Sequence, residues 1–142
     1  MREVILIAGL PGSGKSFLGR ELALETGYHF LDDVSRTLDP DRDPARQLSQ
    51  YSKLPGLVLA DPLLCAKEGI ANARALLSQA FPLVPVRLIC FENDVPACLR
   101  NVKARADGRD VVGLIHSLAA TWRPQDLKDC EVRRVYSFPC KD

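Results

Sequence analysis

Residues 9–16 read Gly-Leu-Pro-Gly-Ser-Gly-Lys-Ser, and this stretch decides the fold. It has the complete form G-x-x-x-x-G-K-[ST], in which a glycine-rich turn presents successive backbone N–H groups to an anion. The apolar run over residues 4–8 comes directly before it and is typical of a strand buried on both faces. A helical pattern follows, so the positive end of a helix would point at the bound anion. Strand, glycine-rich turn and helix together predict a binding site for a nucleoside triphosphate.

Each residue type in this loop has a chemical purpose. The glycines allow the sharp turn and the close approach of backbone to phosphate. Lys15 would reach the β- and γ-phosphates, and the hydroxyl of Ser16 would ligate Mg²⁺. We therefore expect ATP and Mg²⁺ as ligands. The loop residues expected to contact the nucleotide are Gly9, Pro11, Gly12, Ser13, Gly14, Lys15 and Ser16.

Length and composition limit the remaining choices. A chain of 142 residues with 46% hydrophobic and 26% charged residues has the composition of one globular domain. The apolar runs are too short for a transmembrane helix, and the start of the chain leaves no room for a secretion signal. Five cysteines without metal-ligand spacing indicate reduced thiols. We expect a single cytoplasmic domain over residues 1–142, without a membrane partner. A net charge of +1 gives no overall signature of nucleic-acid binding.

Strand and helix patterns alternate along the chain, which predicts an α/β fold. Such alternation specifies a parallel sheet with right-handed crossovers and helices on both faces. Ligands then bind at the carboxyl ends of the strands. The expected strands cover residues 4–8, 28–31, 57–60, 84–91 and 131–136. The expected helices cover residues 16–25, 67–81, 94–106 and 111–122, with a shorter one near 45–53.

Acidic residues follow two of these strands. Asp61 comes directly after an apolar strand, in the form of a Walker B segment, where it could hold Mg²⁺ through water or position a neighbouring group. An ordinary loop acid is the other interpretation. Asp33 follows another strand and could accept the proton of an acceptor hydroxyl. By itself, the pair Asp32-Asp33 would be read as a helix cap or a turn. Arg36, three residues after Asp33, could hold an anionic part of the acceptor.

Basic residues cluster between two of the expected helices. They are Arg100, Lys103, Arg105 and Arg109. Such a cluster is often only a solvated helix face. Its position also fits a lid over residues 103–111, from which an arginine could neutralise charge on the γ-phosphate and so bind the nucleotide. Arg105 is the first candidate for this catalytic role and Arg109 the second.

These motifs resemble the 5′-kinase domain of phage-type polynucleotide kinases, within the P-loop kinases, over roughly residues 4–122. Asp33-Val34-Ser35-Arg36 matches the D-x-x-R segment of that family. The resemblance implies that Asp33 is the general base and that Arg36 contacts the phosphate of the acceptor. It also implies that Asp61 is the required strand-end acid and that Arg105 stabilises the transferring phosphate. The lid arginine is displaced by one residue from the family pattern, and Phe17 replaces the commoner threonine.

The sequence therefore predicts a three-layer P-loop kinase fold with a parallel five-stranded sheet in the order 2-3-1-4-5. The expected activity is ATP-dependent transfer of the γ-phosphate to a hydroxyl, first of all the 5′-OH at a nucleic-acid end. A nucleoside or another small hydroxyl compound is the close alternative. A non-kinase ATPase or nucleotide-binding module is the alternative from another class. Asp33 and Arg36 favour a kinase, since a simple ATPase needs no base for an acceptor hydroxyl.

Overall fold

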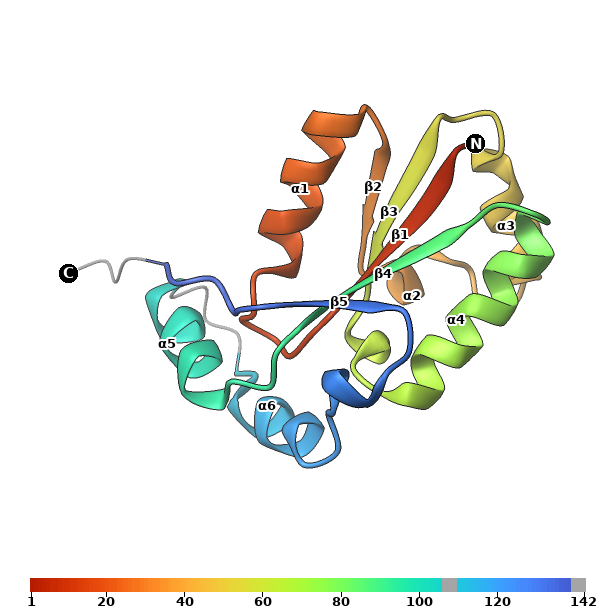
Figure 1. The fold of residues 1–142 in the computed structure, drawn as a ribbon. Helices are drawn as coiled ribbons and strands as arrows, with labels where there is room; N and C mark the ends of the chain where they lie inside the picture. Colours follow the sequence, from red (N-terminus) through yellow and green to blue (C-terminus); the bar gives the residue numbers. More distant parts are fainter. Residues whose placement is uncertain (106–109, 139–142) are drawn as a thin grey trace.

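A computed structural model describes residues 1–105 and 110–138, which form a three-layer α/β fold (Figure 1). Within these residues, five parallel strands form one sheet in the order β2-β3-β1-β4-β5, as the sequence predicts. The central position of β1 places the glycine-rich turn in the middle of the carboxyl edge of the sheet. The strands are β1 (Glu3–Ala8), β2 (His29–Asp32), β3 (Gly56–Ala60), β4 (Val86–Phe91) and β5 (Cys130–Arg133).

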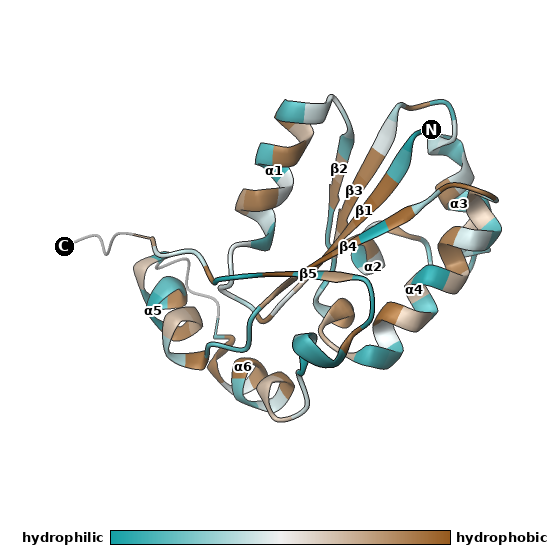
Figure 2. Ribbon diagram, in the orientation of Figure 1, coloured by the Kyte–Doolittle hydropathy of each residue, from teal (hydrophilic) through white to brown (hydrophobic). Residues whose placement is uncertain are grey.

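Helices cover both faces of this sheet, because each central strand is apolar on both sides (Figure 2). Along β1, Leu6 packs in a core cluster with residues of α3 and α4, whereas Ile5 packs with residues of α1 on the opposite face. The helices are α1 (Lys15–Thr26), α2 (Val34–Thr37), α3 (Pro44–Leu48), α4 (Lys67–Ala80), α5 (Val95–Arg105) and α6 (Val112–Ala119). The short 3-10 turns are η1 (Ser49–Tyr51), η2 (Pro62–Leu64) and η3 (Pro124–Asp126). No helix in the described part of the chain has both the length and the apolar character needed to cross a bilayer.

The start of β4 and the end of α6 differ from the prediction for local reasons. β4 begins at Val86 rather than residue 84, because Pro85 has no N–H to donate and Val84 N closes a turn on Phe81 O at 3.2 Å. α6 ends at Ala119 rather than residue 122. Trp122 lies just beyond the helix and is 1% exposed, with its indole N–H donating to Phe91 O at 3.0 Å. It therefore anchors the turn after α6 in the core.

The chain leaves the sheet earlier than expected near its carboxyl end. β5 ends at Arg133, whereas the sequence predicts a strand through residue 136. Tyr136 N instead donates to the carbonyl of Ser13 in the glycine-rich turn, at 3.1 Å. Residues 134–138 are called the C-terminal strap below. The strap lies on the phosphate-binding turn rather than beside β4.

Candidate functional site

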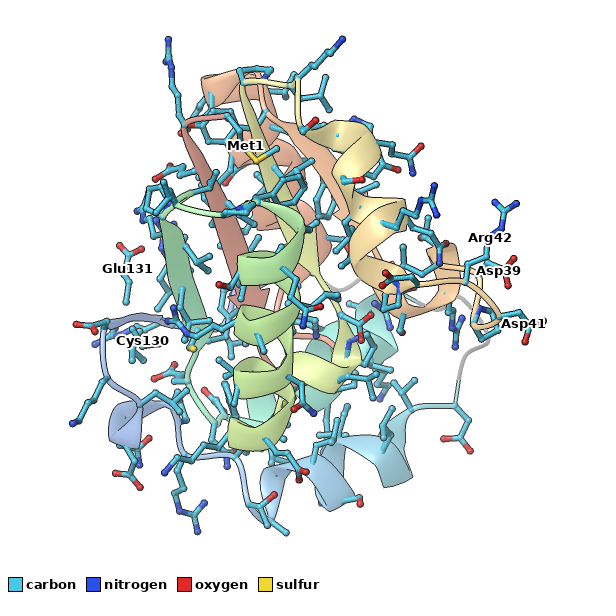
Figure 3. The ribbon with its side chains drawn as sticks, turned by 90° about the vertical axis from the view of Figure 1, so that its right-hand side faces the viewer. Met1, Asp39, Asp41, Arg42, Cys130 and Glu131 are labelled. Atoms are coloured by element: carbon cyan, nitrogen blue, oxygen red, sulfur yellow. The ribbon has the colours of Figure 1, made fainter. Side chains whose placement is uncertain are left out.

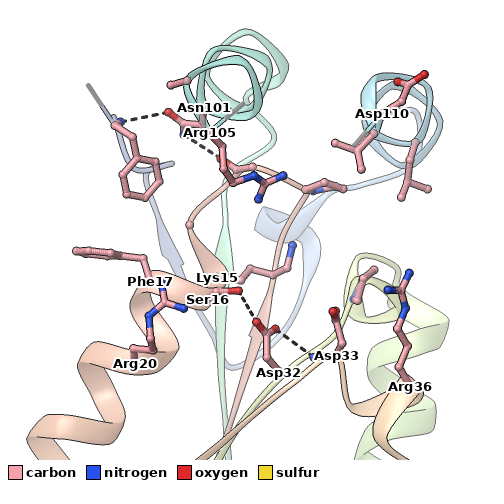
Figure 4. A pocket seen from close by; sticks show the side chains of 18 residues that line it. Lys15, Ser16, Phe17, Arg20, Asp32, Asp33, Arg36, Asn101, Arg105 and Asp110 are labelled. Atoms are coloured by element: carbon pink, nitrogen blue, oxygen red, sulfur yellow. Dashed lines mark hydrogen bonds between the residues drawn. The ribbon is translucent and has the colours of Figure 1, made fainter. Parts of the chain in front are cut away.

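The phosphate loop, residues 9–16, turns tightly between β1 and α1 (Figure 4). Gly12 and Gly14 have φ values of +84° and +108°, a region that other residues rarely adopt. A Cβ on Gly14 would lie 2.2 Å from Cδ2 of Tyr136, and one on Gly12 would lie 2.6 Å from the carbonyl oxygen of Cys98. Both positions thus require glycine, for conformation and for space. The strap and α5 support the loop from outside.

Part of this loop lines a cavity of about 780 Å³. The lining loop residues are Pro11, Gly12, Gly14, Lys15 and Ser16. Gly9 and Ser13, also predicted to contact the nucleotide, are buried behind them. Among the described residues, Ser13 Oγ has no hydrogen-bond partner, and it sits 2.6 Å from where a Cβ on Gly9 would lie. Gly9 has therefore no room for a side chain.

Lys15 extends across the loop that precedes it. Its Nζ donates to the carbonyl oxygens of Gly9 at 2.8 Å and Leu10 at 3.1 Å. Burial lowers the pKa of this ammonium below its ordinary value, and nearby acidic groups, including Asp32 and Asp33, oppose the shift. Hydrogen bonds to neutral carbonyls are weaker than those to a phosphate. An incoming triphosphate would therefore compete well for the ammonium.

Ser16 pairs with Asp32, an acid to which the sequence alone assigns no catalytic or binding role. Its hydroxyl donates to Oδ2 of Asp32 at 2.6 Å, and Oδ1 of Asp32 accepts the Asp33 N–H at 3.1 Å. A hydroxyl beside a carboxylate is the kind of hard oxygen set that Mg²⁺ prefers, together with water and substrate phosphates. The residues present thus fit a magnesium ion, with Ser16 and Asp32 as its protein partners.

Asp33 and Arg36 lie across the same cavity from the phosphate loop (Figure 4). Asp33 has a φ of +50° at the amino end of α2, a left-handed conformation that aspartate tolerates better than most residues. Arg36 follows one turn later, and its backbone N–H donates to Asp33 O at 2.9 Å. The cavity therefore brings a carboxylate and a guanidinium opposite Lys15 and Ser16. Their predicted roles as base and acceptor ligand stay predictions.

Asp61 has a different environment from that of the other predicted residues. It is 6% exposed, its Oδ2 accepts the N–H of Ser35 at 2.6 Å, and its Oδ1 accepts the N–H of Leu63 at 2.8 Å. These bonds fasten α2 to η2 at the end of β3. Asp61 faces a second cavity rather than the one that Lys15 lines. A role of Asp61 in metal or acceptor binding stays a prediction. In the structure, its carboxylate accepts backbone hydrogen bonds from both α2 and η2.

The predicted lid is only partly described. Arg105, the last residue of α5, lines the cavity and extends toward the phosphate loop (Figure 4). Asp110, Val111 and Leu114 continue the wall on the far side. Arg109, the second lid candidate, lies outside the described residues. The structure thus brings Arg105 to the site, and the lid over residues 103–111 stays a prediction.

Asn101 connects three parts of the site, which the sequence did not reveal. Its Nδ2 donates to Gly12 O at 2.8 Å and to Tyr136 O at 2.5 Å, and its Oδ1 accepts the Phe138 N–H at 3.2 Å. The strap adds aromatic contacts, since the rings of Phe17 and Tyr136 lie 5.0 Å apart, edge to face. Nothing in the local sequence distinguishes a buried, fully bonded asparagine from a surface one. Only the tertiary fold reveals it.

Comparisons with known proteins agree with this architecture. The chain is similar to a gluconokinase from Sinorhizobium meliloti 1021, with a TM-score of 0.63 and 16% identity, covering 95% of this chain and 85% of that one. It is also similar to a sugar kinase from Janibacter sp. HTCC2649, with a TM-score of 0.66 and 15% identity, covering 95% and 86%. These likenesses show that the fold is that of the P-loop kinases.

A closer likeness appears at the level of sequence. No model of a known protein family matches the chain. Uncharacterized protein R277 of Acanthamoeba polyphaga mimivirus is 32% identical over 141 residues, which cover 95% of this chain and 98% of that protein. Identity of this level over nearly the whole of both chains shows common ancestry. The chain belongs to the same family as this mimivirus protein.

Proposed function

We propose that the chain is an ATP-dependent kinase that transfers the γ-phosphate to a hydroxyl of a small molecule. One observation carries the proposal: Lys15 and Ser16 line one cavity of about 780 Å³ together with Asp33 and Arg36. A site that only hydrolysed ATP would need to orient water, but not to place a base and a cation on the acceptor side. The pairing of donor and acceptor groups therefore supports transfer to another molecule.

On the donor side, the backbone N–H groups of the loop and the ammonium of Lys15 bind the phosphates. Ser16 and Asp32 would hold Mg²⁺, which when bound neutralises charge on the β- and γ-phosphates. Arg105 lies over the same cavity, and its guanidinium stabilises the charge that develops on the γ-phosphate oxygens. These groups act mainly by position and charge, as phosphoryl transfer requires.

On the acceptor side, the carboxylate of Asp33 takes the proton of the attacking hydroxyl. The hydroxyl oxygen forms a bond to the γ-phosphorus while the bond from that phosphorus to the β–γ bridging oxygen breaks, so that ADP leaves. Arg36 lies beside Asp33 and favours an acceptor with an electronegative or anionic group near its hydroxyl.

A 5′-hydroxyl end of DNA or RNA is the second candidate acceptor. The D-x-x-R spacing of Asp33 and Arg36 favours it. A small molecule stands first because the chain carries a net charge of only +1. Polynucleotide binding draws most of its affinity from cationic contacts to phosphates. Two structural neighbours are also named as kinases of gluconate and of a sugar, which supports a small acceptor.

Transfer of labelled phosphate tests the proposal directly. The purified chain is incubated with Mg²⁺ and γ-labelled ATP, with nucleosides, sugars and 5′-hydroxyl oligonucleotides as separate acceptors. Asp33→Asn should lower the rate of transfer at least ~100-fold, as expected when a general base is lost, without weakening ATP binding. Asp126→Asn is the matched control, since Asp126 is exposed and lines neither cavity. Label that appears only as free phosphate with every acceptor would refute the kinase and favour an ATPase.

A further inference from the structure

A second cavity of about 460 Å³ lies on the other side of α2 from the phosphate site. It opens between the α2–α3 segment and the first three turns of α4, which pack side by side (Figure 3). Its lining is mostly leucine and other apolar side chains, among them Val34, Leu38, Leu48, Leu63, Ala73 and Leu76. This volume and lining are those of a site for a small organic molecule.

The two cavities are separated by a wall one residue thick. Along α2 and its two capping residues, Asp33 and Arg36 line the first cavity, whereas Val34 and Leu38 line the second. Neighbouring Cα atoms lie only ~3.8 Å apart, so the two cavities come close to each other along this segment. The same alternation occurs in η2, where Pro62 faces the first cavity and Leu63 the second.

The wall between the cavities is firmly built. Asp61 accepts hydrogen bonds from the N–H groups of Ser35 and Leu63, which fixes α2 against η2. Gly69 of α4 lies so close to η2 that a Cβ there would come within 1.9 Å of Leu63 O. Leu63 is nevertheless 67% exposed at the lip of the second cavity. Leu63 thus gives an acceptor a fixed apolar surface to lie against at the edge of the second cavity.

We propose that this second cavity holds the body of the phosphate acceptor, and that the acceptor is a nucleoside. This inference rests on the proposed function and names its substrate class. The nucleobase packs among the leucines, and the sugar crosses the lip at Leu63 so that its hydroxyl reaches Asp33. Burying a flat ring against leucine is favourable, whereas the many hydroxyls of a sugar or polyol would lose hydrogen bonds there.

The polar groups of the cavity fit the edge of a base. Glu68 and Asn72 lie four residues apart on α4, so they share one face of the helix, and both are exposed side chains that line the cavity. The carboxylate of Glu68 can accept hydrogen bonds from the edge of a nucleobase, and the amide of Asn72 can both accept and donate. In an apolar site, a small number of polar groups is enough to fix the orientation of a ligand. We expect these two to set the preference among bases.

Equilibrium binding tests whether the second cavity binds a nucleoside, independently of phosphate transfer. Labelled adenosine, guanosine, cytidine and uridine are dialysed against the protein, with labelled ribose as the matched probe that lacks a base. Ala73→Leu replaces a methyl by an isobutyl group inside the cavity, and Ala75→Leu makes the same replacement on the exposed side of α4. We expect Ala73→Leu to weaken binding of the preferred nucleoside at least ~10-fold, and Ala75→Leu to bind it as the unmodified chain does.

Transfer assays with the same probes complete the test. The preferred nucleoside should exceed ribose in kcat/KM at least ~100-fold, and Ala73→Leu should raise the KM for nucleoside while leaving that for ATP unchanged. Ribose bound as tightly as every nucleoside, or equal effects of the two alanine variants, would overturn the assignment. A nucleoside that binds in the cavity but never receives phosphate would refute its assignment as the acceptor, whereas the kinase itself would be refuted only if no acceptor received phosphate.

Discussion

Replacing Asn101 should lower the free energy of unfolding more than replacing an exposed asparagine. Its side chain joins the phosphate loop at Gly12 to the strap at Tyr136 and Phe138. The residue is only 5% exposed. Asn101→Ala removes all three hydrogen bonds, whose partners lie in the half-buried residues Gly12, Tyr136 and Phe138.

The magnitude follows from these contacts. A hydrogen bond contributes about 1 kcal/mol net, and an unpaired buried group costs at least as much. The three contacts of Asn101 therefore predict a loss of about 3 kcal/mol in the free energy of unfolding. For a chain of this size, that loss corresponds to a fall of about 10 °C in Tm. Urea denaturation followed by tryptophan fluorescence measures it, because the single Trp122 is buried.

Asn93→Ala is the matched control. Asn93 is exposed, and its Nδ2 donates to Ala119 O at 2.8 Å and Trp122 O at 3.0 Å. Trp122 O keeps a second donor, Nη1 of Arg123 at 3.2 Å, and Ala119 is only half-buried, so we expect a loss of at most about 1 kcal/mol. ATP affinity should fall in Asn101→Ala and not in Asn93→Ala, because only the former loosens the phosphate loop. If the two variants unfolded at the same urea concentration, the reasoning from burial would be wrong.

Three further predictions concern the loop and the core. Gly14→Ala should weaken ATP binding by about 2 kcal/mol or more in calorimetric titration, because the φ of +108° and the ring of Tyr136 both oppose a side chain; unchanged affinity would contradict this. Ser16→Ala should abolish most of the gain in ATP affinity that Mg²⁺ gives, and a full gain in that variant would exclude Ser16 as a ligand. Burial raises the pKa of Cys65 to about 12 and of Cys98 to about 11, from an ordinary value of 9.0. Both pKa values are higher in the folded chain, so protonation of these thiols favours the folded state. This contribution to the free energy of unfolding is fully present below pH 9. Above pH 9 it falls by about 1.4 kcal/mol per pH unit for each thiol, until the folded pKa of that thiol is reached. Urea midpoints at pH 8, 9 and 10 measure the loss, and Cys65→Ala should show a shallower fall than the unmodified chain.

The sheet could be predicted from sequence because its signals are local. The continuous apolar run of β1 and the glycine-rich turn define the centre of the fold, and Leu18 and Leu22 mark the buried face of α1. The sequence does not predict α2, because the position of this helix depends on distant groups. Asp61 accepts a hydrogen bond from the N–H of Ser35, 26 residues away, and no pattern within a four-residue helix predicts such a bond.

The choice between the two adjacent acids could not be made from sequence. Successive side chains of a strand point to opposite faces, so the end of β2 decides which acid meets Ser16. β2 continues through Asp32, and Asp33 then turns into a left-handed conformation. Asp32 therefore contacts Ser16, while Asp33 lines the cavity toward Arg36. A shift of the strand end by one residue would exchange these positions.

The bond between Tyr136 and Ser13 also has a consequence for biosynthesis. The phosphate loop leaves the ribosome before the residues that support it, which are Asn101 and the strap at residues 134–138. Until the strap has emerged, the nascent chain holds a loop that lacks these contacts. The ability to bind nucleotide should thus appear late in translation, and a ribosome stalled before residue 134 should carry a chain that does not retain ATP.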